Sequence, residues 1–301
     1  MKKYVKWTGI VLLSPVILFV LLSILIYLPP VQNFLVSQVT RYASETTGMQ
    51  IHIGRLSLSF PLDLVVSETK VIDKQDTILT VDKLTAKVQM WPLLRKEVEL
   101  DGLELKGATV NTAQLIEGMQ LKGHLGEFFI ESHGVALDPE TATINSIHLK
   151  DTHLAMNLAD TTATDTTSSA PLFWKIKLLQ ADMENVSFML DMPLDTMRMS
   201  IELGKALLKN GTVDLHQSAY SAEHLTLQQG KAEFHTSNMP AQEGLDPAHI
   251  EVSGLNLSVD SMYYAGNNIR ANIHNFELKE RSGLELLSTK GRLIADKEVI
   301  R

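Results

Sequence analysis

The feature that most constrains this fold is a two-residue alternation of apolar and polar side chains that begins at Met49 and recurs along the rest of the chain. Successive side chains of a β-strand point to opposite faces, so this period predicts strands with one apolar face. Ile51 and Ile53 alternate with polar neighbours, and after Gly54 the phase steps by one residue and resumes at Leu56. A glycine inside such a run predicts a β-bulge.

Similar alternation continues to about residue 287, and within it a short phrase recurs at Leu103–Val110, Ile147–Leu154 and Ala206–Val213. The centres of these phrases are Lys-Gly, Lys-Asp and Lys-Asn. Because Gly, Asp and Asn favour turns, each phrase predicts a hairpin. No segment of ten or more residues after residue 48 has helical periodicity, which favours an antiparallel meander over a parallel βαβ arrangement.

The N-terminus carries a different signal, a run of 20 uncharged residues from Gly9 to Leu28. At about 1.5 Å per residue this run spans about 30 Å, the thickness of a bilayer core. Lys2, Lys3 and Lys6 precede it, which predicts a cytoplasmic N-terminus. A cleaved signal peptide is the rival interpretation, although its apolar region is usually about 7–15 residues long. A buried core helix would normally show a polar face.

The segment after Pro29 and Pro30 has the periodicity of an amphipathic helix, with Val31, Leu35 and Val39 on one side. Gly48 predicts its end, because glycine accepts the left-handed conformation common after helices. The apolar side predicts packing either on the following β-structure or on a membrane surface.

These patterns predict five regions. Residues 1–30 form the cytoplasmic tail and transmembrane anchor, and 31–48 the amphipathic helix. Residues 49–158 form a first β-segment, 159–171 a flexible Thr/Ser/Asp-rich loop, and 172–301 a second β-segment that ends inside a strand pattern, as in a truncated chain.

Composition excludes several classes of function. A net charge of −8 without a basic run argues against nucleic acid as a partner. No cysteine is present, and no phosphate-binding loop or nucleophile motif occurs. His148 and His153 flank Asp151, but five residues along a strand place the histidines on opposite faces, so we expect no metal site. We therefore expect no enzymatic activity and no cofactor.

The apolar faces of these strands must be shielded from water by another layer or by a ligand. A sandwich, a solenoid, or a curved sheet that holds lipid acyl chains would each provide this shielding, and periodicity alone does not separate them.

A series of short motifs then follows the amphipathic helix in order: Gly48–Leu64, Val71–Leu79, Val81–Val88, Trp91–Leu94 and Leu100–Val110. In this order the motifs resemble the start of the AsmA-like superfamily, most closely its TamB-type branch. The resemblance covers about the first 110 residues well and the remainder only in style.

The resemblance implies an elongated, curved, antiparallel β-groove, a half-pipe anchored in the inner membrane with its bulk in the periplasm. It implies handling of phospholipid between the inner and outer membranes, or alternatively a tethered scaffold for outer-membrane protein assembly or secretion. It also implies an outer-membrane β-barrel partner that would bind a C-terminal region missing here. The residues expected to line the groove are Ile51, Ile53, Leu56, Leu58, Phe60, Leu84, Val88, Leu103, Leu105 and Val110.

Overall fold

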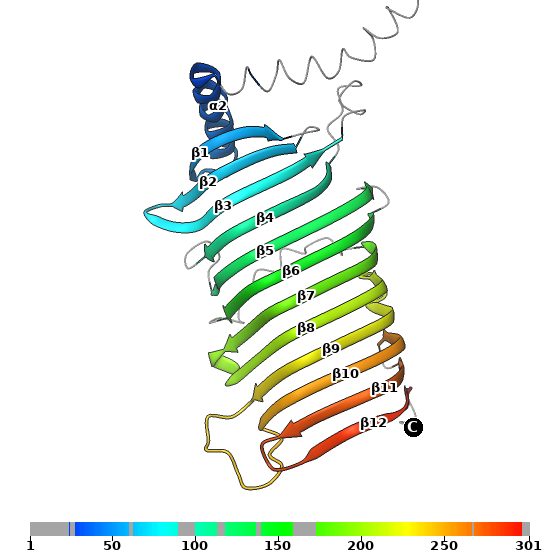
Figure 1. Cartoon of the computed structure of the whole chain (residues 1–301). Helices are drawn as coiled ribbons and strands as arrows, with labels where there is room; N and C mark the ends of the chain where they lie inside the picture. Colours follow the sequence, from blue (N-terminus) through cyan, green and yellow to red (C-terminus); the bar gives the residue numbers. More distant parts are fainter. Residues whose placement is uncertain are drawn as a thin grey trace, which may run out of the picture. The chain divides into compact units, whose positions relative to one another are not determined.

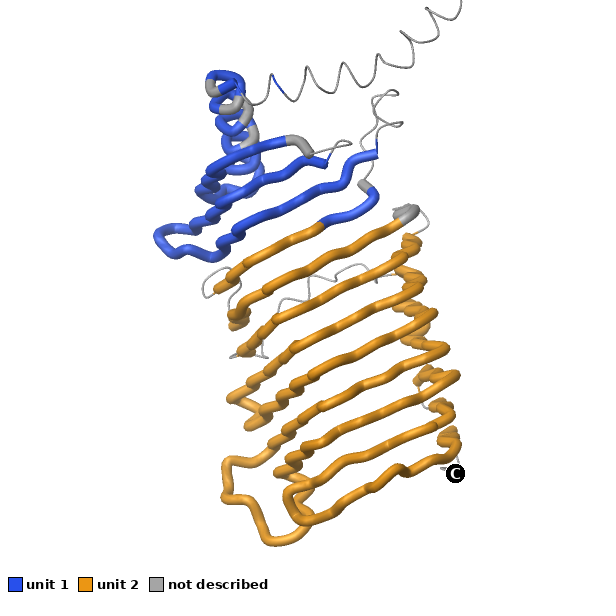
Figure 2. The backbone as a smooth tube through the Cα atoms, in the orientation of Figure 1, with its two compact units in different colours: residues 1–103 blue, residues 104–301 orange. Residues whose placement is uncertain are grey.

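The computed structural model describes residues 24, 28–59, 63–89, 100–112, 118–136, 140–158, 173–266 and 268–296. Within these residues the chain is all-β, as predicted, with helix α2 ahead of twelve strands (Figure 1). The chain divides into two compact units, which are residues 1–103 and residues 104–301 (Figure 2). The predicted anchor falls almost entirely outside the described residues, and in the described part no helix is long and apolar enough to cross a bilayer.

Helix α2 runs from Pro29 to Thr47 and confirms the predicted amphipathic helix. Proline is suited to the first turn, where its missing N–H has no partner to lose. Gly48 ends the helix in the left-handed region, with φ of 71°, and its N–H donates to the carbonyl of Ser44 at 2.9 Å. The exit glycine therefore acts as the sequence predicts.

The first unit contains an antiparallel meander of β1 (Gln50–Ser59), β2 (Asp63–Asp73) and β3 (Asp76–Val88). At Gly54 the phase step is confirmed, because Ile53 is half-buried, Arg55 is exposed and Leu56 is only 5% exposed. The predicted bulge is wrong. Ile53 pairs with Thr69 and Arg55 with Ser67, so no extra residue interrupts the register.

The second unit carries long strands in sequence order. They are β4 (Leu100–Asn111), which begins in the first unit, β5 (Met119–Ala136), β6 (Thr141–Leu158), β7 (Lys175–Met192), β8 (Met197–Asp214), β9 (Ala219–His235), β10 (His249–Ala265), β11 (Asn268–Glu280) and β12 (Glu285–Ala295). A short 3₁₀ turn, Pro193–Asp195, joins β7 to β8.

The expectation of a wholly antiparallel sheet is wrong at one place, because β6 and β7 pair in parallel from Thr141–Lys175 to Asn157–Asp191. The chain leaves β6 at Leu158 and enters β7 at Lys175, which lie at opposite ends of the paired strands. A parallel neighbour requires such a crossing, whereas a tight hairpin gives an antiparallel one. The predicted Thr/Ser/Asp-rich loop, 159–171, lies in this connection and outside the described residues.

Two rows of residues cross the second unit where the regular pairing is interrupted. We call them the first and second bend rows. The first consists of Gly126, Asp151, Asn185, Gly204 and Gln229, and the second of Asn145, Leu179, Asn210, Glu223 and Ser261. In β6 the rows are six residues apart (151 − 145 = 6), and the same separation holds in β7, β8 and β9.

Left-handed residues occupy these rows. Asp151, Asn185, Asn210 and Gln229 have φ between 48° and 55°, one such residue in each strand from β6 to β9. A left-handed residue breaks the pleat, so two consecutive side chains point to one face and the alternation steps by one residue. Figure 1 shows the strands of this unit bending along their length. Glu68 repeats the arrangement opposite Gly54 in the first unit, with φ of 55°.

The three predicted hairpin turns are wrong for the same reason. Gly107, Asp151 and Asn210 lie inside the single strands β4, β6 and β8, and each has a positive φ. The residues that favour a turn do adopt the backbone conformation of a turn. Because only one residue at each place does so, the chain bends without reversing.

Glycines in the first bend row are required by close approach. A Cβ on Gly126 would lie 2.8 Å from both the Cβ and the carbonyl oxygen of Asp151. The carbonyl is backbone and cannot rotate away, unlike a side-chain tip.

Gly126→Ala should therefore lower the free energy of unfolding by about 1–3 kcal/mol, the usual cost of overpacking. Gly291→Ala in β12 is the matched control, since no atom lies within 4 Å of its added Cβ. Urea unfolding followed by circular dichroism measures both variants. Equal stability of the two would contradict the crowding at the bend.

Candidate functional site

The strand segment between the two bend rows carries an apolar face. Directly opposed residues on neighbouring strands point to the same side of a sheet. One continuous row is Phe128–Leu149–Met183–Ala206–Leu227–Leu257, and the next is Ile130–Ile147–Ala181–Leu208–Leu225–Val259. Twelve positions on six strands thus hold no polar side chain.

The same face continues beyond both bend rows. Because the alternation steps by one residue at each row, the residues on this face shift there from odd to even positions or the reverse. Past the first bend row the cross-strand rows are Leu125–Thr152–Val186–Leu203, Gly123–Leu154–Phe188–Ile201–Ala232–Val252 and Leu121–Met156–Leu190–Met199–Phe234–Ile250. Past the second they are Ile144–Leu178–Gly211–Ala222–Met262 and Ala142–Ile176–Val213–Tyr220–Tyr264. These rows and the two central ones together are the apolar face.

Large side chains of the apolar face are not covered by any described element. The buried hydrophobic residues in the described part of the second unit are Ala108, Ala142, Ala181, Ala222 and Val259, with no Leu, Ile, Phe or Met among them. Side chains sealed between two packed sheets would instead be mostly buried. A tight sandwich is therefore excluded for the described residues.

The opposite face is charged. One row, Glu127–Lys150–Glu184–Lys205, alternates in sign across four strands and ends at Gln228 in β9. Lys106 extends it from β4, with its Nζ 2.9 Å from Glu104 and 3.9 Å from Glu127. The hydrogen bond to Glu104 raises the pKa of Lys106. Opposite charges across a strand pair favour this register over its neighbours.

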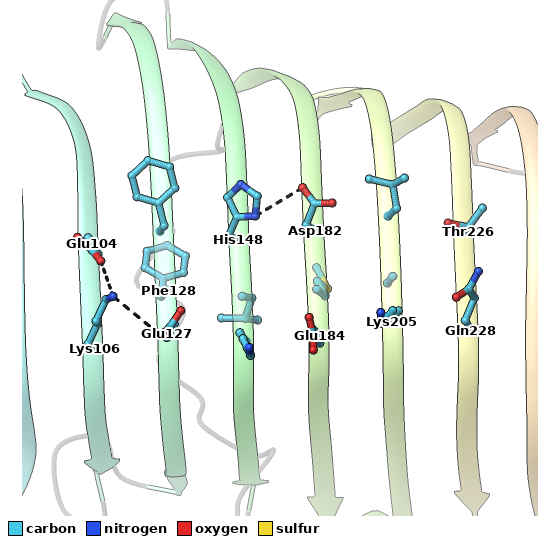
Figure 3. Close-up of a pocket in the computed structure, with 16 residues that line it drawn as sticks. Glu104, Lys106, Glu127, Phe128, His148, Asp182, Glu184, Lys205, Thr226 and Gln228 are labelled. Carbon is cyan, nitrogen blue, oxygen red and sulfur yellow. Dashed lines mark ion pairs between the residues drawn. The ribbon is translucent and has the colours of Figure 1, made fainter.

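A depression of about 610 Å³ lies between this charged row and the next polar-face row, which contains His148 and Asp182 (Figure 3). The Nδ1 atom of His148 is 3.5 Å from a carboxylate oxygen of Asp182. The prediction that His148 and His153 face opposite sides is wrong, because the step at Asp151 places both on the charged face. They have separate partners, since Nδ1 of His153 lies 2.8 Å from the hydroxyl of Ser187. In the described ranges no group of His, Asp and Glu is arranged to hold a metal ion.

Two further histidines of the charged face share one carboxylate. Asp260 lies 2.6 Å from Nδ1 of His224 and 2.7 Å from Nε2 of His274. The hydrogen bond from His224 is the main cause of the lowered pKa of Asp260. The three groups come from three adjacent strands and join β9, β10 and β11 across the charged face.

The predicted lining residues of the first unit also share one face. The opposed sets are Ile51–Val71–Leu79, Ile53–Thr69–Val81, Leu56–Val66–Leu84 and Leu58–Leu64–Ala86, with Val88 two residues beyond Ala86 in β3. On the opposite face of this unit Val65 and Thr85 are buried as well, at 7% and 5% exposure.

Of the other predicted residues, Phe60 lies outside the described residues, and Leu103, Leu105 and Val110 lie in β4. Sequence reasoning missed the larger part of the apolar face, such as Met183, Leu208 and Leu225. Their alternation is visible in the sequence, but the step at Asn185 or Asn210 hides that runs on either side share one face.

Comparison with known proteins adds no family: no family model matches the chain, and no curated protein matches it. The function must therefore be argued from the two faces themselves.

The alternating row predicts a selective cost for charge reversal. Lys150→Glu places three carboxylates on adjacent strands, between Glu127 and Glu184, and should cost about 1 kcal/mol of unfolding free energy. Lys177→Glu is the matched control, because its neighbours are Thr143 and Thr212. The difference in urea midpoint between the variants should shrink in high salt. An unchanged midpoint for Lys150→Glu would show that the row does not stabilise the sheet.

Proposed function

We propose that this protein is an inner-membrane-anchored periplasmic β-groove protein that handles phospholipid between the inner and outer membranes. The observation that carries the proposal is the apolar face, which crosses six strands and has no described cover. Its only polar side chains, in the rows given above, are Thr152 and the phenols of Tyr220 and Tyr264. Exposed apolar area on this scale marks a binding surface in soluble proteins.

Small residues at the bends support a concave shape for this face. Thr152 is 0% exposed and Ala222 3%, and both lie next to bend-row positions on the apolar face, while Ala181, 4% exposed, lies two residues from Leu179. Gly211 and Gly230 occupy corresponding places and are also buried. With no described layer above them, we take this burial as support for crowding on the inside of a bend. On the opposite, charged face Glu184 and Asn185 are exposed at the same points.

The proposed apolar trough suits an acyl chain. Each methylene moved from water to an apolar surface contributes about 0.8 kcal/mol, so a chain with 14 methylenes gains on the order of 11 kcal/mol at full burial. In the described part of the second unit, the apolar face has no buried side-chain donor or acceptor without a partner. The charged outer face keeps the sheet in water.

The membrane assignment rests on the sequence. The uncharged Gly9–Leu28 run and the lysines before it support one span with a cytoplasmic N-terminus and a periplasmic β-structure. The resemblance to the TamB-type branch supports the same placement and the phospholipid substrate. The bends and the continuous apolar face are what a half-pipe of that kind requires.

Photo-crosslinking tests the proposal directly. A benzophenone amino acid at Leu208, on the apolar face, should form adducts with phospholipid acyl chains in cells. The same probe at Lys209 is the matched control, because it follows in the same strand and points to the charged face.

Lipid adducts at Leu208 and not at Lys209 are the expected result, read by mass spectrometry of the labelled chain. Protein adducts at Leu208 without lipid would overturn lipid handling and favour a scaffold for outer-membrane protein assembly.

A further inference from the structure

An open cavity of about 610 Å³ lies within the first unit, between α2 and the neighbouring strand β1. Asn33, Val36, Ser37, Thr40 and Arg41 line it from the helix. Their spacing of three or four residues places them on one side of α2. The strand contributes four consecutive residues, His52 to Arg55, along its length. Figure 1 shows α2 beside β1.

Helix α2 is held against β1 by a direct bond. The hydroxyl of Ser44 accepts a hydrogen bond of 3.1 Å from the backbone N–H of Ile51. Within the first unit β1 pairs on one side with β2, so the helix covers the start of its other edge. Covering an edge strand protects its unpaired backbone groups. The cavity begins one residue further along, where the strand carries its basic side chains.

The lining is basic and contains no carboxylate. Arg41 and Arg55 bring two permanent positive charges, His52 adds an imidazole, and Asn33 and Ser37 add neutral donors. Glu68 of β2 reaches over Gly54, with its Oε2 2.7 Å from the position of an added Cβ, but does not line the cavity. In the described part of the chain, no carboxylate forms an ion pair with Arg41 or Arg55. An arginine without a carboxylate partner can present its fork of donors to an anion.

A buried hydroxyl provides an independent observation. Oγ1 of Thr40 is buried and has no hydrogen-bond partner among the described residues. Leaving such a group unsatisfied destabilises a protein, so its retention on a cavity wall is a sign of function. It stands one residue from Arg41 and on the same side of the helix as Val36 and Ser37.

We propose that this cavity binds a phosphate group. Two arginines match the geometry of phosphate oxygens, and the hydroxyl and amide donors complete its coordination. Where the proposed lipid function holds, the phosphate belongs to a phospholipid headgroup that reaches the protein beside its membrane anchor. Phosphate binding is inferred from the residues that line the cavity. Only the identification of the phosphate as a lipid headgroup rests on the proposed function.

The test uses the full chain in detergent and three probes: phosphatidylglycerol, a diacylglycerol with the same acyl chains, and inorganic phosphate. The variant is Arg41→Gln with Arg55→Gln. Lys83→Gln is the matched control for charge removal, because Lys83 is aligned with Arg55 through Ser67 on the same face but lies outside the cavity.

Loss of two charge-assisted contacts should weaken binding of the phosphate-bearing probe at least about tenfold in the double variant and leave the control unchanged. Diacylglycerol binding should be the same in all three proteins. Tight binding of phosphatidylglycerol identifies a headgroup as the source, and equally strong binding of inorganic phosphate identifies the free ion. Equal affinities of the double variant, the control and the unmodified protein for every phosphate-bearing probe would overturn the site.

The variant Thr40→Val separates a role of this hydroxyl in binding from a role in stability. Removing an unpaired buried hydroxyl should leave the urea midpoint equal or higher, while phosphate binding weakens. If Thr40→Val binds phosphate as tightly as the unmodified protein, the hydroxyl is not part of the site.

Lipid adducts at Leu208 report on a different unit. If no lipid adducts form at Leu208 but phosphate still binds, the proposed function is wrong and the phosphate site stands. If lipid adducts form but phosphate binding is unaffected by the double variant, only the phosphate site is wrong.

Discussion

The two faces of this sheet depend on the bend rows, where the alternation steps by one position inside long strands. Each strand from β6 to β9 has one left-handed bend-row residue, such as Asn185, and steps at its other bend-row position without one. Without that step, strands of 17 or 18 residues would present two faces of mixed polarity. With it, apolar side chains on both sides of a bend gather on one face and charged ones on the other. The left-handed conformation costs free energy in a non-glycine residue, and side-chain bonds help to offset it: Asn185 donates to Asp151 at 2.7 Å and Asn210 to Glu223 at 2.6 Å.

The two faces have different tasks in this arrangement. Hydrogen bonds and charges across strands specify the register on the outer face, where Lys150 lies between Glu127 and Glu184. The apolar face, which no described layer covers, can then contact something else. A sheet that used its apolar side for packing against a second layer would lose this freedom, and the half-exposed leucines of β8 and β9 show that the described layer has not done so.

Much of this fold could be predicted from local pattern. The period-2 alternation predicts an all-β chain, Gly48 predicts the end of α2, and the phase step at Gly54 is visible in the sequence. The hairpins predicted from the Lys-Gly, Lys-Asp and Lys-Asn phrases are wrong, because local pattern does not distinguish a single left-handed bend from a hairpin. That outcome depends on whether the neighbouring strands continue past the point, which is a long-range property. The parallel pairing of β6 with β7 has no local signal for the same reason. The cavity beside α2 was also beyond prediction, since Arg41 and Arg55 meet only when the helix packs along β1.

The central claim is that the apolar face is an open trough occupied by acyl chains. Native mass spectrometry of the full chain, extracted in a mild detergent, measures this most directly. The account predicts masses of the protein with intact phospholipid bound, and loss of those masses when Leu208 and Leu225 are both replaced by glutamate. A protein that is lipid-free on gentle extraction, or that keeps the same lipid after both replacements, would contradict it.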